Sequence, residues 1–176
     1  MMSSRRDAET QRPEWVFGSD RCRFFTGSAS ISAPPRLCVN PMDSRGDGEA
    51  QRDLNNTSGQ IVDAAVHVHM RLGPGLLESV YERVLAYELE KRGLTVERQV
   101  PVPITYDDIR FEEGFRADLI VEKFVIVELK SVETMAPVHG KQLLTYLRLM
   151  DCRLGLLINF GAPLLKDGVK RIVSDF

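Results

Sequence analysis

Three charged residues near the middle of the chain have types and spacing that suit phosphate chemistry. Asp118 opens an apolar, β-rich run, and a second such run ends in Glu128-Leu129-Lys130. Strand side chains alternate between the two faces of a sheet, so Glu128 and Lys130 point the same way. Two carboxylates beside an ammonium are poor material for a hydrophobic core. They suit a site that holds a divalent cation next to a proton donor or a charge-stabilising group.

The carboxylates of Asp118 and Glu128 share a face only if the two runs pair in one register. Opposite residues of an antiparallel pair have numbers with a constant sum, and the even sum of 246 places these two residues opposite each other. That sum requires a turn with an odd number of residues, such as Glu122-Lys123-Phe124. A two-residue turn would put Asp118 on the wrong face unless a bulge intervened.

A hard cation such as Mg²⁺ prefers oxygen ligands and usually takes only one or two protein carboxylates, with water and substrate phosphate completing its shell. Asp118, Glu128 and the main-chain carbonyl of Leu129 could supply such a site. Lys130 would then orient an attacking water or neutralise charge that develops on the phosphate. An exposed polar strand end, with Asp118 as a solvated neighbour, is the alternative interpretation of the same residues.

Two helical patterns add candidate side chains to this site. Glu78 and Tyr81 are three residues apart and share a helix face, at the border of an apolar stripe where a carboxylate is costly unless it is paired or binds metal. Gln142 and Tyr146 are four apart on the helix after Lys130, and could hydrogen-bond a phosphate, a base edge or the lysine. Each pattern has an ordinary alternative: a glutamate favoured by the dipole at a helix start, and a single amphipathic tyrosine.

The periodicity of the chain predicts an α/β domain (α+β mixed) with the element order ααβββαββ, in which helices flank a central mixed sheet. Pro101 and Pro103 place at least part of the first strand at a sheet edge, and Gly114 suggests a bulge in the second. Residues 161–168 are expected to form a loop. The helices are expected at 55–72, 77–91 and 137–150, and the strands at 95–106, 110–121, 124–131, 154–160 and 169–173.

Composition separates the first 53 residues from the rest of the 176-residue chain. Residues 1–53 are rich in Ser, Arg, Pro and Gly and have no sustained period, so they cannot bury enough apolar surface to offset their ordering entropy. We therefore expect residues 1–53 to form a disordered extension and residues 54–176 to form the folded domain. One hypothesis places the start of the native protein at Met42.

Charge and apolar content limit the classes of partner and compartment. The formal net charge is −2, without a basic excess in either region, so any contact with nucleic acid must be local, weak or assisted by metal. The three cysteines are too few and too scattered for a disulfide framework or a zinc site. No apolar run approaches the ~18 residues of a membrane helix, and no secretory signal is evident. These features predict a cytoplasmic protein without a membrane partner.

Together the motifs resemble those of the GxxExxY protein family, which belongs to the PD-(D/E)XK nuclease-like superfamily. The similarity covers about residues 55–176, and it implies a restriction-endonuclease-like core with Mg²⁺- or Mn²⁺-dependent phosphodiester hydrolysis in active members. The matching segments are Gly75-x-x-Glu78-x-x-Tyr81, Arg116-Ala117-Asp118, Glu128-Leu129-Lys130 and Gln142-x-x-x-Tyr146.

The resemblance also implies a role for each matching residue. Asp118 and Glu128 match the metal-binding carboxylates, Glu78 the first-helix carboxylate that often completes the metal site, and Lys130 the catalytic lysine. Gln142 and Tyr146 match the motif on the helix after the catalytic strand. Ala117 stands where the superfamily name has Pro, a residue that shapes the backbone and takes no part in the chemistry.

These observations predict a Mg²⁺-dependent nuclease whose substrate is nucleic acid, expected to be DNA. A catalytically silent binding or assembly module with the same fold is the alternative, favoured by the low net charge and small size. A domain of this size has little surface for a duplex, so a homodimer or a protein partner is also expected. A metal-dependent hydrolase of another phosphate ester is a third interpretation.

Overall fold

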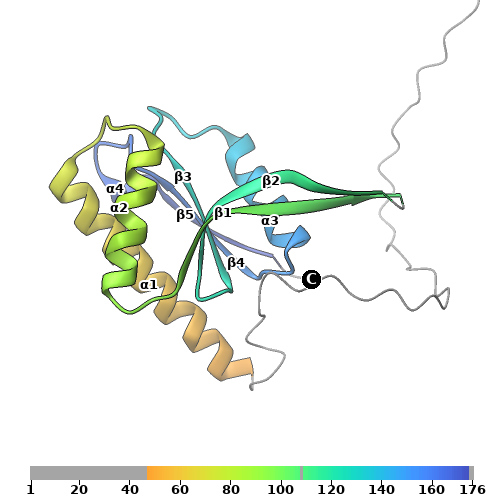
Figure 1. Cartoon of the computed structure of the whole chain (residues 1–176). Helices are drawn as coiled ribbons and strands as arrows, with labels where there is room; N and C mark the ends of the chain where they lie inside the picture. Colours follow the sequence, from red (N-terminus) through yellow and green to blue (C-terminus); the bar gives the residue numbers. More distant parts are fainter. Residues whose placement is uncertain (1–46, 108, 175–176) are drawn as a thin grey trace, which may run out of the picture. The chain divides into compact units, whose positions relative to one another are not determined.

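The computed structural model describes residues 47–107 and 109–174, and Figure 1 shows their arrangement. The predicted disorder of residues 1–53 and the hypothesis about Met42 concern residues that lie almost entirely outside this range. The elements are α1 (Asp47–Leu72), α2 (Glu78–Lys91), β1 (Val96–Tyr106), β2 (Ile109–Val121), β3 (Val125–Lys130), α3 (Pro137–Leu149), β4 (Leu154–Asn159), α4 (Leu165–Gly168) and β5 (Val169–Val173).

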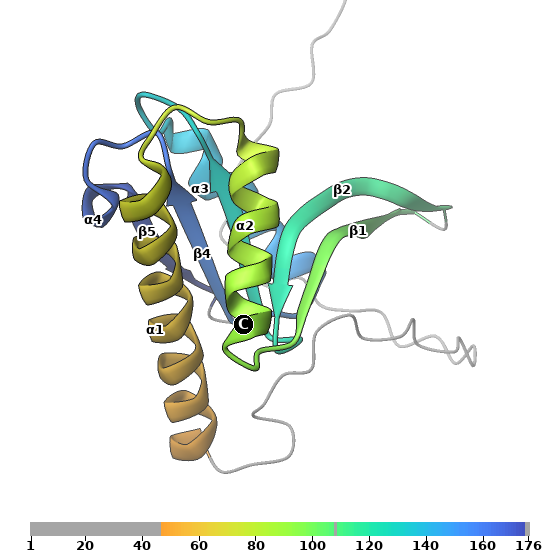
Figure 2. The same ribbon diagram turned by 60° about the vertical axis from the view of Figure 1, so that its left-hand side comes forward.

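The five strands form one mixed sheet in the order β1-β2-β3-β4-β5. β3 and β4 are parallel, and the other neighbouring strands are antiparallel. One apolar layer joins α1 and α2 to the sheet, and a second joins α3 to the opposite face (Figure 2). The predicted mixed sheet flanked by helices is confirmed, and β1, which carries the two prolines, lies at an edge as expected.

Two helices differ from the sequence-based expectation. α1 begins at Asp47, whereas the prediction placed its cap near Asn55. The apolar stripe extends further back than expected, because Ala50 and Leu54 are buried. The segment 161–168, expected to be a loop, contains the four-residue helix α4, whose Leu165 is buried in the core on the α1 side of the sheet. Both differences come from tertiary packing, which local sequence does not report.

The predicted bulge lies in the part of β1 and β2 that extends beyond the pairing of β2 with β3. The pairing changes register between Val102↔Phe115 and Ile104↔Phe111, which leaves extra residues on β2 around Gly114. A Cβ added at Gly114 would overlap with Cγ1 and Cδ1 of Ile104, so the bulge needs glycine there. Beyond it the two strands continue as a projecting hairpin (Figure 2).

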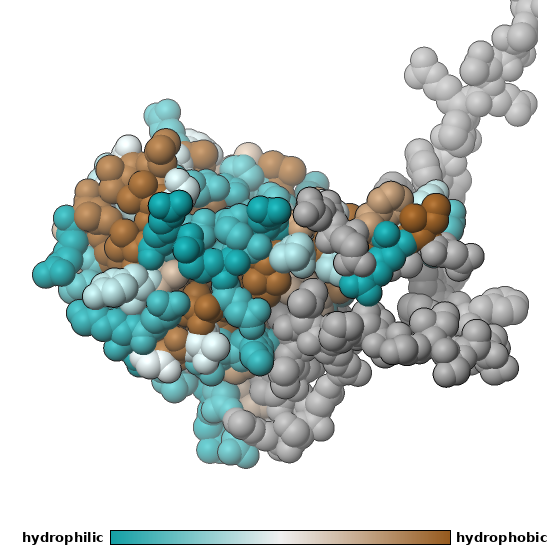
Figure 3. All heavy atoms as spheres, viewed as in Figure 1, coloured by the Kyte–Doolittle hydropathy of each residue, from teal (hydrophilic) through white to brown (hydrophobic). Residues whose placement is uncertain are grey.

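Apolar side chains are exposed at the corner where α1 ends and α2 begins (Figure 3). Met70 and Leu77 are 80% and 74% exposed, and Leu72 and Leu76 are exposed beside them. Among the described residues, no helix is long and apolar enough to cross a bilayer. The exposed corner is an apolar patch on the surface. It borders the first turn of α2, where Glu78 lies.

Candidate active site

The register of β2 and β3 is the one that the sequence predicts. The numbers of each recorded pair sum to 246, and the strands are joined by Glu122, Lys123 and Phe124. Glu122 and Lys123 have φ values of 54° and 63°, the left-handed conformation that closes this three-residue turn. The recorded pairs are Leu119↔Val127, Ile120↔Ile126 and Val121↔Val125.

This register brings Asp118 to the end of β3, beside Glu128. Ile126 belongs to the core beneath α3, so alternation along β3 places Glu128 on the α3 side of the sheet. Ala117 and Ile120 both belong to that core, so β2 departs from strict alternation at Asp118. Asp118 lies one residue beyond the last recorded pair. Its Oδ2 atom accepts a hydrogen bond of 2.8 Å from the backbone N–H of Leu129, so this carboxylate is tied to the end of β3.

Lys130 connects the strand to the start of α2. Its Nζ atom donates to Oε1 of Glu128 at 2.8 Å and lies 3.6 Å from Oε1 of Glu78. Glu128 is only 3% exposed, whereas the side chain of Glu78 is 42% exposed. The structure therefore brings Glu78, Glu128 and Lys130 together, with Glu78 at the rim and Glu128 inside.

Burial raises the pKa of both strand carboxylates, Asp118 and Glu128. The pKa of Glu128 is raised from 4.5 to about 7, first because burial removes solvent and then because of the negative charge of Asp118; the hydrogen bond from Lys130 opposes these effects. Burial likewise raises the pKa of Asp118, against the backbone hydrogen bond from Leu129 and the charge of Lys130. Glu128 is consequently near half-protonation at neutral pH.

Lys130 is a permanent cation at this site. Burial alone would lower its pKa, but the hydrogen bond to Glu128 and the charges of Glu128, Glu78 and Asp118 outweigh that effect and raise it. A protonated ammonium cannot accept a proton, so Lys130 is unsuited to act as a general base. It is suited to stabilise negative charge on a phosphate.

The site fits a divalent cation held by two carboxylates. Oε2 of Glu128 is buried and has no hydrogen-bond partner in the part of the chain that the structure describes, and such an atom is costly unless an ion or a proton satisfies it. Within residues 47–107 and 109–174 no three His, Cys, Asp or Glu residues form a group that could hold a metal. Glu78 faces Lys130, so the predicted set of three carboxylates is not assembled here. Asp118 and Glu128 suffice for Mg²⁺, which usually takes only one or two; the Leu129 carbonyl stays a predicted ligand.

Gln142 and Tyr146 form a pair on α3. Nε2 of Gln142 lies 2.6 Å from the hydroxyl of Tyr146, which is buried and packs its ring against Phe115 with centroids 5.1 Å apart. Burial raises the pKa of Tyr146, and the charge of Glu128 adds to the effect. No hydrogen bond between the described residues connects the pair to Lys130, so of the three partners considered for it, a phosphate, a base edge and the lysine, the lysine is not bound here.

Tyr81 supports the site indirectly, because it fixes the Gly-Pro-Gly turn that precedes Glu78. Its hydroxyl donates to the carbonyl of Gly73 at 2.6 Å and accepts from the N–H of Leu76 at 3.2 Å. Its ring stacks on Phe160, with centroids 4.3 Å apart and planes at 8°. The tyrosine of the sequence motif thus sets where α2 begins, and Glu78 is the first residue of that helix.

Sequence reasoning missed three polar residues beside Asp118. Glu82 is only 5% exposed and is bound by Arg98 and Gln99. The available signal was the position of Glu82 one helical turn after Glu78, since a carboxylate there needs a partner. The sequence offers no comparable signal for Gln99, because the position of its side chain depends on a left-handed backbone conformation within β1.

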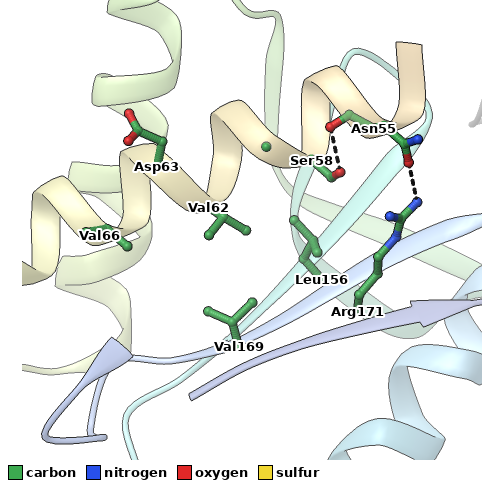
Figure 4. A pocket seen from close by; sticks show the side chains of 9 residues that line it. Asn55, Ser58, Val62, Asp63, Val66, Leu156, Val169 and Arg171 are labelled. Carbon is green, nitrogen blue, oxygen red and sulfur yellow. Dashed lines mark hydrogen bonds between the residues drawn. The ribbon is translucent and has the colours of Figure 1, made fainter. Parts of the chain in front are cut away.

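A cavity of about 450 Å³ lies elsewhere, between α1 and the strands β4 and β5 (Figure 4). Val62, Val66 and Leu156 form part of its apolar wall. At one end Arg171 donates a hydrogen bond of 2.9 Å to the side chain of Asn55. None of the candidate site residues lines this cavity, so it plays no part in the site around Glu128.

The mixed sheet between helical layers, with buried carboxylates and a lysine on adjacent strands, defines a nuclease-like α/β domain. A family model described as the PD-(D/E)XK nuclease superfamily matches residues 55–172, and the chain belongs to this superfamily. The match is to the superfamily, so membership of the narrower GxxExxY family stays a prediction. No curated protein and no solved structure matches the chain.

Proposed function

We propose that this protein is a nuclease that hydrolyses phosphodiester bonds of DNA with the help of Mg²⁺ or Mn²⁺. The superfamily match supports nuclease activity and a nucleic-acid substrate. One structural observation carries the proposal to this site: the buried Oε2 of Glu128 has no hydrogen-bond partner among the described residues, while Asp118 is held at the next residue of β3 by the N–H of Leu129. A cation would satisfy both carboxylates.

Asp118 and Glu128 would hold the cation, with Glu78 and the Leu129 carbonyl at its periphery. When bound, such an ion acidifies a water molecule and neutralises phosphate charge. Glu128 gives up its proton on becoming a ligand, because a carboxylate binds metal only when ionised. This release couples cation affinity to pH across the pKa of about 7 of Glu128.

Lys130 would stabilise the charge that accumulates on the scissile phosphate. Its ammonium is held by Glu128 at 2.8 Å and by Glu78 at 3.6 Å, so it is fixed before substrate binds and needs little reorganisation. Gln142 and Tyr146 would contact the substrate from α3. Their mutual hydrogen bond orients the amide and hydroxyl groups that a phosphate or base edge could use.

The test is cleavage of linear, circular and single-stranded DNA, and of RNA, by the purified chain with Mg²⁺ or Mn²⁺. Lys130→Met should abolish cleavage, whereas Lys123→Met, which removes an exposed lysine from the β2–β3 turn, should leave it unchanged. Absence of cleavage with every substrate and both ions would refute the proposal. So would equal cleavage by the Lys130 variant.

A catalytically silent binding or assembly module is the second candidate. It is favoured by the net charge of −2 and by the lack of a three-ligand metal group among the described residues. The exposed apolar corner around Met70 and Leu77 suits a protein partner or a second copy of the chain. Calorimetry separates the candidates, since a module would bind no divalent cation and its melting temperature would not respond to Asp118→Asn. Hydrolysis of a phosphate ester other than nucleic acid stays a prediction. The cytoplasmic location of the protein also stays a prediction.

A further inference from the structure

Gln99 has a backbone conformation that a strand residue normally avoids. Its φ is 52°, in the left-handed region, and the recorded pairs of β1 and β2 continue on both sides of this position but omit Gln99 and Asp118. The left-handed conformation is unfavourable for a residue with a Cβ, because the Cβ comes too close to the following carbonyl oxygen. Interactions of the side chain must therefore hold Gln99 in place.

The amide of Gln99 lies between two carboxylates. Its Nε2 atom donates to Oε2 of Glu82 at 2.7 Å and to Oδ1 of Asp118 at 3.4 Å. Glu82 is itself fixed, because its Oε1 accepts from Nε of Arg98 at 2.9 Å and lies 2.8 Å from Nη2 of the same guanidinium. One end of the amide is thus anchored to an ion pair between the buried Glu82 and the exposed Arg98, which connects α2 to β1.

Both oxygens of Asp118 are consequently held from opposite sides. Oδ2 accepts the N–H of Leu129 at 2.8 Å, and Oδ1 accepts the longer contact from Gln99. A carboxylate oxygen has two lone pairs, so each oxygen can accept one of these hydrogen bonds and still offer an electron pair to a cation. The two donors determine how the carboxylate is turned.

We propose that Gln99 is a positioning residue, anchored by Glu82, which orients the Asp118 carboxylate for a divalent cation. The inference rests on the proposed function, because it requires Asp118 to be a ligand. Outer partners of metal ligands typically change metal affinity by 10–100-fold when they are removed. A purely structural connection between α2 and β1 would instead change stability and leave affinity alone.

The test is calorimetric titration of the full chain with Mn²⁺, together with the melting temperature. Gln99→Asn keeps a residue type that tolerates positive φ but shortens the side chain by one methylene, so the amide no longer reaches both carboxylates. We expect its Kd for Mn²⁺ to rise by about tenfold while the chain stays folded. Gln51→Asn makes the same change at an exposed position of α1 and should leave the Kd unchanged. Gln99→Gly, which accepts positive φ without strain, is the second variant should the Asn variant fail to fold.

The outcomes separate this inference from the proposed function. A wild-type chain that binds no Mn²⁺ overturns both. A wild-type chain that binds Mn²⁺, with an equal Kd for a folded Gln99 variant, overturns the inference alone. Glu82→Gln should weaken binding, and should weaken it no further in the Gln99→Asn background; independent, additive losses would overturn the anchoring role of Glu82.

Discussion

Replacing Glu128 by Gln should stabilise the cation-free protein at alkaline pH, although Glu128 lies at the centre of the candidate site. The pKa of Glu128 is about 7 in the folded protein and 4.5 ordinarily, so the folded state binds the proton more tightly. Below about pH 4.5 Glu128 is protonated in both the folded and the unfolded state, so its raised pKa does not change the free energy of unfolding. As the pH rises toward 7 the unfolded state ionises first, and the free energy of unfolding falls.

The size of the effect follows from the two pKa values. Their difference, from 4.5 to about 7, multiplied by about 1.4 kcal/mol per pH unit, gives a full penalty of ~3 kcal/mol above pH 7. At pH 5 only roughly a quarter of the penalty is present. The cost of packing a glutamine amide is the same at both pH values. The advantage of Glu128→Gln over the wild type should therefore grow by about 2–3 kcal/mol between pH 5 and pH 8.

Urea unfolding with EDTA at pH 5 and pH 8 measures this growth. Glu97→Gln is the matched control, because Glu97 is an exposed strand glutamate and its replacement should give the same difference from wild type at both pH values. The reasoning is refuted if the free energy of unfolding of Glu128→Gln differs from that of the wild type by the same amount at both pH values, or by more at pH 5. Adding Mg²⁺ at pH 8 should stabilise the wild type and not the Glu128 variant.

Three further predictions test parts of the same structure. Asp118→Asn should lower the pKa of Glu128, since the charge of Asp118 helps to raise it; an unchanged carboxyl titration by NMR would contradict this. Tyr81→Phe removes the hydroxyl that donates at 2.6 Å to the turn before α2, and should reduce the free energy of unfolding by about 1–2 kcal/mol in urea. Gly161→Ala would place a Cβ in overlap with the backbone oxygen of Val132 and should lower the melting temperature, whereas Gly59→Ala, with nothing within 4 Å, should not.

The register that brings the catalytic candidates together could be predicted from the sequence because two independent rules agree on it. Alternation fixes which residues of each strand face the core, and the length of the turn fixes which residues are opposite. Glu122-Lys123-Phe124 satisfies both, and the recorded pairs of β2 and β3 sum to 246 as expected. Lys130 follows Glu128 by two residues, so its position was determined once the strand was assigned.

The remaining features depend on contacts between distant segments. The start of α1 lies before the predicted cap because Ala50 and Leu54 are buried in the core, which a local preference for Asn and Ser at helix starts does not reveal. Gln99 lies in a strand pattern that gives no reason to expect positive φ. Its conformation makes sense only once Glu82 and Asp118 are seen on either side of its amide.

The energetic cost of Glu128 bears on the choice between a nuclease and a silent module. A buried carboxylate with a pKa of about 7 costs the cation-free fold ~3 kcal/mol above neutrality, and a neutral side chain of the same shape would avoid that cost. A ligand that binds only the folded state, at about one hundred times its Kd, stabilises that state by ~2.7 kcal/mol. Cation binding at Glu128 would thus offset nearly the whole penalty. A module that binds no cation has no corresponding gain, so a large stabilisation of the wild type by Mg²⁺ at pH 8 favours the nuclease on thermodynamic grounds, independently of any cleavage assay.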